Sequence, residues 1–149
     1  MFEIKIENLD ELRRSFQKAP KLTDGILQNS TKTAGKRILA TEKAEVPTMS
    51  GALRRSIKME YTPIQVIIRP NKEYAIYVHD GTGVYGVNKR PIIAKNAKFL
   101  RFKINGKWIY KKSVVGQQPN PFVDRTVTKT NNPVNAIFNK ALDEILRKI

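Results

Sequence analysis

The chain has 149 residues, no cysteine and one histidine, and its 28 lysine and arginine residues against 13 acidic ones give a formal net charge of +15. This length fits one domain with a sizeable core, and the lack of cysteine excludes disulfides and thiolate metal sites. No apolar stretch reaches the roughly 18 residues that a membrane span requires, and the N-terminus does not resemble a secretion signal. The composition therefore predicts a soluble globular protein that does not bind membranes.

The positive charge is concentrated in one part of the chain. Residues 81–123 contain no acidic residue but nine lysine and arginine residues. Such a stretch attracts polyanions at low salt. Two interpretations stay open, a surface that faces nucleic acid and a solvated lysine-rich face.

The first half of the sequence predicts a strand and two helices. Apolar and polar residues alternate over residues 2–7, as in a half-buried strand. Apolar residues with helical spacing over residues 9–16 predict a short helix that ends near Pro20. A longer helix is expected from about Lys21 to Glu45. Its two glycines are either tolerated there or allow another backbone to approach.

The middle of the chain mixes helical and strand signals. A helix stop at Pro47 is followed by a turn and by residues 53–57, which predict a brief helix or the entry to a strand. Residues 56–61 and 64–69 are rich in β-branched side chains and predict two strands. Residues 74–78 fit a helical turn and a strand equally, and Gly83 to Ala97 are expected to form a long flexible loop.

The strongest local signal is a β-hairpin that joins residues 99–104 to residues 107–112 through Asn105-Gly106. A two-residue type I′ turn pairs Ile104 with Lys107 and places two sets of side chains on opposite faces. One face holds Leu100, Phe102, Ile104 and Ile109. The other holds Arg101, Lys103, Trp108 and Tyr110. The basic and aromatic face is suited either to contact nucleic acid or to pack cationic stems over its own rings.

The C-terminal part predicts further helical structure. Pro119 and Pro121 favour an extended approach to a helix that begins at about Pro121, with Phe122 as an apolar anchor. A last helix carries an apolar face from Val134 to Ile149, which serves the core or a subunit interface. The expected fold is a single α+β domain over residues 1–149. It combines a small antiparallel or mixed sheet and a prominent hairpin with a long helix of the N-terminal half and a C-terminal helix.

Catalytic chemistry is poorly represented in the sequence. His79 is the single histidine, and no carboxylates are spaced to complete a metal site, so no metal or cofactor is expected. The adjacent Asp80 is expected to point in a different direction from His79, which leaves acid–base catalysis without an orienting group. Gly81-Thr82-Gly83 is too short for a phosphate loop and predicts a flexible turn. We therefore expect no enzyme.

Three ordered motifs carry a family resemblance. The first, VPTMSGALRRSI, offers Pro47, Ser50, Gly51, Leu53, Arg54, Ser56 and Ile57. The second, YAIYVHDGT, offers Tyr74, Ala75, Gly81 and Thr82, with His79-Asp80 where the family has a glutamate. The third, NPFVDRTV, offers Pro121 and Phe122. Together they resemble the neck or tail-completion family of tailed phages, the head-tail joining proteins typified by gene product ten of a lambdoid coliphage.

The resemblance implies a structural virion protein at the head-tail junction, assembled in the host cytoplasm as one subunit of a homo-oligomeric ring around the DNA channel. Its implied partners are other neck and tail proteins, with non-specific contact to genomic DNA. Candidate residues for a DNA-facing or interface surface are Lys89, Arg90, Lys98, Arg101, Lys103, Lys107, Trp108, Tyr110, Lys111 and Lys112. Two alternatives stay open, a free non-specific nucleic-acid-binding protein and a small basic ribonuclease.

Overall fold

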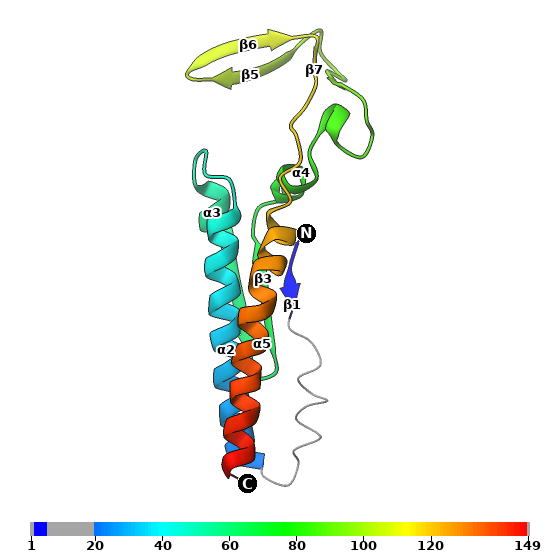
Figure 1. The fold of residues 1–149 in the computed structure, drawn as a ribbon. Coiled ribbons are helices and arrows are strands. Elements are labelled where there is room, and N and C mark those ends of the chain that lie inside the picture. Colours follow the sequence, from blue (N-terminus) through cyan, green and yellow to red (C-terminus); the bar gives the residue numbers. More distant parts are fainter. Residues whose placement is uncertain (1, 6–19, 149) are drawn as a thin grey trace. The chain divides into compact units, whose positions relative to one another are not determined.

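The computed structural model describes residues 2–5 and 20–148, which form an α+β fold (Figure 1). The expected helix at residues 9–16 and the end of the expected first strand lie outside the described residues. The chain divides into two compact units. We call residues 1–73 with 122–149 the first unit and residues Tyr74–Pro121 the second unit.

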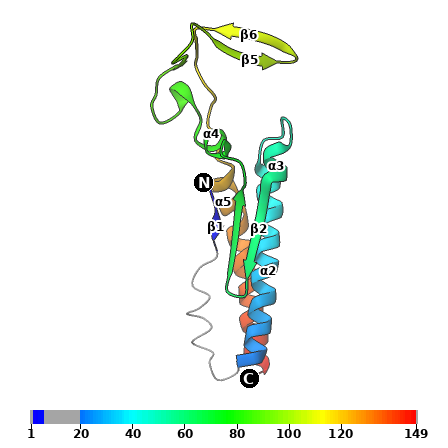
Figure 2. The ribbon, with the colours of Figure 1, turned by 180° about the vertical axis from the view of Figure 1, so that it is seen from behind.

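Two long helices dominate the first unit. They are α2 (Pro20–Glu45) and α5 (Phe122–Lys148), which lie side by side and antiparallel (Figures 1 and 2). The long helix expected up to Glu45 is confirmed. Glu45, at the end of α2, accepts hydrogen bonds from Arg125 Nε at 2.9 Å and from Lys129 Nζ at 2.5 Å. These ion pairs connect the end of α2 to the beginning of α5.

Helix α5 is continuous where the sequence suggested two separate helices. It passes through Pro133, which lacks the N–H that would bond to the preceding turn. Thr130, before this proline, and Ala141 and Ile145, after it, are all buried. Because both halves of the helix bury side chains in the first unit, packing keeps the helix intact across the proline.

Threonines make up much of the buried polar surface of both helices. Thr31 Oγ1 donates to the Leu27 carbonyl at 2.8 Å, and Thr130 Oγ1 donates to the Thr126 carbonyl at 2.8 Å. Each bond satisfies the hydroxyl within its own helix. These two buried threonines therefore contribute their methyl groups to the core without leaving a donor unpaired.

A three-stranded antiparallel sheet completes the first unit, with the strands in the order β1-β3-β2. The strands are β1 (Ile4–Lys5), β2 (Ile57–Thr62) and β3 (Gln65–Pro70). The two strands expected near residues 56–61 and 64–69 are confirmed, with Ile57 opposite Pro70 and Thr62 opposite Gln65. Alternate residues of β3, namely Val66, Ile68 and Pro70, are buried.

The two glycines of α2 have different surroundings. A Cβ on Gly35 would lie 2.7 Å from Cγ1 of Val66 on β3, whereas a Cβ on Gly25 would meet nothing within 4 Å. Gly35 therefore lets α2 approach the sheet, and Gly25 is a tolerated glycine. The close neighbour of Gly35 is a side chain rather than the backbone that the sequence suggested.

The other elements of the described residues are short. Helix α3 (Ala52–Ser56) is the expected brief helix of the first unit. In the second unit, the ambiguous segment forms helix α4 (Ala75–Asp80). The residues after it form a 3₁₀ turn, η1 (Gly83–Tyr85), and four strands: β4 (Ile92–Ile93), β5 (Leu100–Ile104), β6 (Lys107–Lys111) and β7 (Ser113–Val114). β4 pairs with β7, and β5 pairs with β6.

Candidate functional site

The second unit carries much of the charge of the protein. It contains nine lysine and arginine residues and one acidic residue, Asp80, so its formal net charge is +8. All ten residues expected at a DNA-facing or interface surface lie in this unit. Most of them are on or beside the β5–β6 hairpin, whereas Lys89 and Arg90 precede β4. Each of the ten is exposed.

The hairpin has the register that its sequence predicts. Ile104 lies opposite Lys107, Lys103 opposite Trp108, and the pairing continues to Leu100 opposite Lys111. Asn105 and Gly106 have φ angles of 48° and 82°. A type I′ turn requires positive φ at both of its central positions, which explains why the Asn-Gly pair specifies this hairpin.

One face of the hairpin gathers cations over an aromatic ring. The guanidinium carbon of Arg101 lies 3.9 Å from the centroid of the Trp108 ring, and Lys103 Nζ lies 5.6 Å from it. Trp108 is 52% exposed. The expected basic and aromatic face is therefore present. The cations pack over the hairpin's own ring, and the same exposed side chains could contact nucleic acid.

The stacking limits what this face can do chemically. The guanidinium of Arg101 lies over the Trp108 ring and carries several N–H donors that can bond to an anion. The same guanidinium occupies a face of the indole on which a base would otherwise stack. The geometry therefore suits contact with phosphate better than stacking on bases.

The other face of the hairpin is apolar and only partly covered. Phe102 and Ile109 are half-buried, and Ile104 is 49% exposed. A two-stranded hairpin alone is marginally stable in water. This apolar face is thus a surface that a partner could cover.

The Gly81-Thr82-Gly83 segment forms a pairing that we call the glycine clasp, made of residues 82–84 and 115–117. The Thr82 amide donates to the Gln117 carbonyl at 2.9 Å, and the Val84 amide donates to the Val115 carbonyl at 2.8 Å. The Gln117 amide in turn donates to Thr82 Oγ1 at 2.9 Å. The expected flexible turn is therefore hydrogen-bonded to residues 115–117, which follow β7.

The two residues of the His79-Asp80 pair contact each other, contrary to expectation. His79 Nδ1 and Asp80 Oδ1 are 2.7 Å apart. Both residues lie in the last turn of α4, which ends at Asp80. His79 is 8% exposed. A buried imidazole is poorly placed to reach the phosphodiester of an RNA chain, so the geometry does not favour a ribonuclease.

The first family motif has a local structural explanation. Gly51 precedes α3 with φ of 68°, a left-handed conformation that favours glycine. The Ala52 amide donates to Ser50 Oγ at 3.3 Å, and Ser56 Oγ donates to the Leu53 carbonyl at 2.7 Å. Leu53, Ser56 and the following Ile57 are buried.

In the third motif, Phe122 is fully buried, and its ring meets the Phe2 ring edge-on with the two centroids 6.2 Å apart.

One unusual residue was missed by the sequence analysis. Glu42 on α2 is 1% exposed, and its Oε2 has no hydrogen-bond partner among the described residues. Burial raises the pKa of Glu42 to about 7 from its usual value near 4.5. The sequence spacing could have predicted this burial, because Glu42 lies four residues after Ile38 and continues the buried stripe of the helix.

Two other classes of site are absent from the described residues. In that part of the chain, no three His, Asp or Glu side chains gather where they could hold a metal ion. None of the helices formed by residues 20–148 is long and apolar enough to cross a bilayer.

The chain is a basic α+β protein whose second unit exposes a face with basic and aromatic side chains. Residues 10–81 match the model of the family described as "Bacteriophage HK97-gp10, putative tail-component". The match covers α2, α3, β2, β3 and α4, and it confirms the resemblance to a head-tail or tail family of phages over this region. No curated protein and no solved structure matches the chain significantly. The similarity indicates a structural protein related to the phage tail.

Proposed function

We propose that the protein joins the head to the tail, or completes the tail, as one subunit of a ring around the DNA channel of a tailed-phage virion. The observation that carries this proposal is the family match over residues 10–81, which includes the first sequence motif and all of the second except its last residue, Thr82. The matched region supplies α2 and most of the sheet of the first unit. In this proposal, the whole chain acts as a single neck-type subunit.

The surface of the second unit supports an assembly role. Tyr77 is 60% exposed, Val87 89% and Ile93 65%, and the apolar face of the hairpin is also partly exposed. Apolar surface of this extent commonly marks contacts with other proteins. Neighbouring subunits and connector proteins are the partners that would cover it in a ring.

The charge of the second unit supports a position beside DNA. Non-specific attraction to phosphates holds a polyanion near a surface without fixing its sequence, which suits passage of a genome. Arg101, which lies over Trp108 on the hairpin, is exposed and can make such contacts. We therefore propose that the hairpin and the residues around Lys89 and Arg90 border the channel.

Disrupting the gene in its phage or prophage and examining the induced lysate by electron microscopy tests the proposal. We expect filled heads and finished tails that remain separate, and expression of the wild-type chain in trans should restore joined particles. Normal infectious virions without the gene would contradict a joining or completion role. Joined particles with tails of abnormal length would also contradict it, because they would assign the protein to tail assembly.

A second candidate is a free protein that binds nucleic acid without sequence preference. The same stack of Arg101 and Lys103 on Trp108 favours it. Filter binding to duplex DNA at several salt concentrations distinguishes the two proposals when it is combined with microscopy. Tight, strongly salt-dependent binding together with normal virions would favour this second function.

A further inference from the structure

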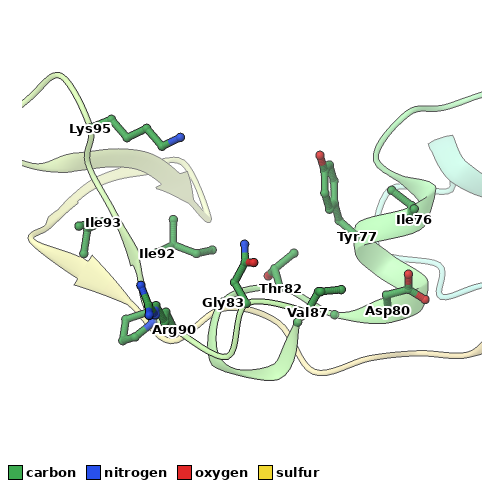
Figure 3. A pocket seen from close by; sticks show the side chains of 14 residues that line it. Ile76, Tyr77, Asp80, Thr82, Gly83, Val87, Arg90, Ile92, Ile93 and Lys95 are labelled. Carbon is green, nitrogen blue, oxygen red and sulfur yellow. The ribbon is translucent and has the colours of Figure 1, made fainter.

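The second unit contains a cleft between α4 and β4, with a volume of about 1140 Å³ (Figure 3). Ile76 and Tyr77 of α4 lie on one side of the cleft, and Ile92 of β4 lies on the other. Thr82 and Val87 lie along the segment that connects the two sides. The glycine clasp fixes one end of this segment through the backbone of Thr82 and Val84.

Large apolar side chains lie on both sides of the cleft and remain uncovered. Tyr77 and Val87 are largely exposed, and Ile76 and Ile92 are each 37% exposed. Four large apolar side chains around one hollow are more than the scattered single residues that a protein surface usually shows. A ligand that fills the cleft would therefore bring apolar groups of its own.

The charged groups of the cleft are mainly positive. Arg90 and Lys95 lie on the β4 side (Figure 3), and Lys89 precedes them in the chain. The one carboxylate in the lining, Asp80, has an oxygen 2.7 Å from His79 Nδ1. The cleft thus offers two cations to an incoming carboxylate, whereas its own carboxylate, Asp80, contacts His79.

Strand β4 adds a backbone contribution. It pairs with β7, with Ile92 opposite Val114 and Ile93 opposite Ser113, in a sheet of two strands. Within the described residues, no strand pairs with the second edge of β4. An unpaired edge offers backbone donors and acceptors to an extended chain.

We propose that the cleft between α4 and β4 binds an extended peptide of a neighbouring virion protein, in which apolar residues alternate with carboxylates and which adds a strand to β4. The alternation gives the peptide one apolar face for the exposed apolar side chains of the cleft and one acidic face for the cations Arg90 and Lys95. A phosphate backbone would satisfy the cations but would leave the apolar walls uncovered. The inference rests on the proposed assembly function, because it names the chemistry of the partner.

Fluorescence polarisation with the full chain and labelled synthetic peptides tests this binding. The probe is a ten-residue peptide that alternates valine with glutamate, and the matched probe replaces every glutamate by lysine. At about 0.15 M salt, where long-range attraction is largely screened, we expect at least tenfold tighter binding of the glutamate peptide. Methylating alternate backbone nitrogens of that peptide should weaken its binding at least tenfold. Equal binding of the glutamate and lysine peptides, or no effect of methylation, would overturn the proposal.

Variants of the protein locate the binding. Arg90→Ala with Lys95→Ala, and separately Tyr77→Ala, should each weaken the glutamate peptide at least fivefold. Lys111→Ala with Lys112→Ala removes the same charge outside the cleft lining and should change the affinity less than twofold. Circular dichroism checks that each variant is folded. Equal losses from the two double variants would show general attraction to a basic protein and would overturn the proposal.

Two further outcomes separate the proposal from other occupants. Displacement of the peptide by a short DNA duplex, with loss of duplex binding in the Arg90/Lys95 variant, would make the cleft a nucleic-acid site and overturn the inference. Self-association that the Tyr77 variant abolishes and the peptide does not inhibit would make the occupant a second copy of this chain, which would also overturn it. Failure of peptide binding alongside separate heads and tails in the gene disruption would refute the cleft assignment alone.

Discussion

Gly83 and Gly116 meet across the glycine clasp so closely that neither can carry a side chain. A Cβ on Gly83 would lie 2.1 Å from the Val115 carbonyl oxygen and 2.9 Å from Cα of Gly116. A Cβ on Gly116 would lie 2.1 Å from the Thr82 carbonyl oxygen. Both glycines also have positive φ, at 64° and 99°. This contact holds the segment that connects the two sides of the cleft against the segment that follows the hairpin.

Substituting either of these glycines by alanine should therefore open the clasp. We expect Gly83→Ala and Gly116→Ala each to cost about 2 kcal/mol or more, because a left-handed backbone and a clash with backbone atoms act together. Hydrogen exchange at the Thr82 and Val84 amides measures the opening directly. Gly106→Ala is the control, since Gly106 has φ of 82° but open space around its Cα. Protection as high in the Gly83 variant as in the Gly106 variant would contradict the role of the clasp.

The glycines of α2 allow a second comparison, within one helix. Gly25→Ala should raise the free energy of unfolding by about 0.5–1 kcal/mol, because alanine reduces the backbone entropy lost in the helix and its Cβ meets nothing within 4 Å. Gly35→Ala should lower it by about 1–3 kcal/mol, because its Cβ would meet Val66 on β3 at 2.7 Å. Urea unfolding of the two variants gives both values. A Gly35 variant more stable than the wild type would show that β3 yields easily at Val66.

The sequence predicted the elements whose signals are local. The Asn105-Gly106 turn specifies both the hairpin and its register, because positive φ at two successive residues admits few alternatives. The boundary of α2 at Glu45 followed from the apolar spacing and the nearby Pro47. The continuity of α5 was not predicted, because whether a helix passes through Pro133 depends on the packing of residues on both sides of it, which a local pattern does not contain.

The candidate site was predictable in part. The hairpin face that carries Arg101 and Trp108 follows from alternation along paired strands. The cleft could not be predicted in this way. Its two sides are formed by Tyr77 and Ile92, and how these residues face each other depends on how the chain between them folds. The glycine clasp joins residues more than thirty positions apart, so Gly83 alone indicated only a turn.

The buried carboxyl of Glu42 predicts a pH-dependent stability. Because the pKa is about 7 in the folded protein and near 4.5 when unfolded, the folded state holds the proton more tightly between these values. The contribution of this carboxyl to the free energy of unfolding is therefore largest below pH 4.5, and this contribution is lost as the pH rises through 7. The loss can reach about 3 kcal/mol by pH 8.

Thermal unfolding of Glu42→Gln between pH 5 and pH 8 measures this contribution. The variant should unfold near the wild-type temperature at pH 5 and at a higher temperature at pH 8, because the amide stays neutral. Glu73→Gln, at an exposed position, is the control and should follow the wild type at both pH values. A Glu42 variant that is equally destabilised at both values would show that the carboxyl makes a structural contact in its neutral form.

Charge reversal on the hairpin tests its proposed position beside DNA. Replacing Arg101, Lys103 and Lys107 by glutamate should leave the fold intact, because all three side chains are exposed. The variant should weaken binding to duplex DNA and flatten its dependence on salt, and the logarithmic slope should change by about 0.9 for each phosphate that the variant no longer neutralises. Complementation of the disrupted gene should then yield fewer infectious particles than the wild-type chain does.

The control for this variant carries the same change of charge on the first unit, at Lys36, Arg37 and Lys140, which are also exposed. If position matters, the control should support more infectious particles than the hairpin variant and should retain more of the salt dependence of DNA binding. Equal titres from the two variants would indicate that net charge alone affects assembly. Wild-type titres from the hairpin variant would remove the hairpin from the DNA channel, because a reversed charge beside a polyanion repels it over a distance of about 8–10 Å.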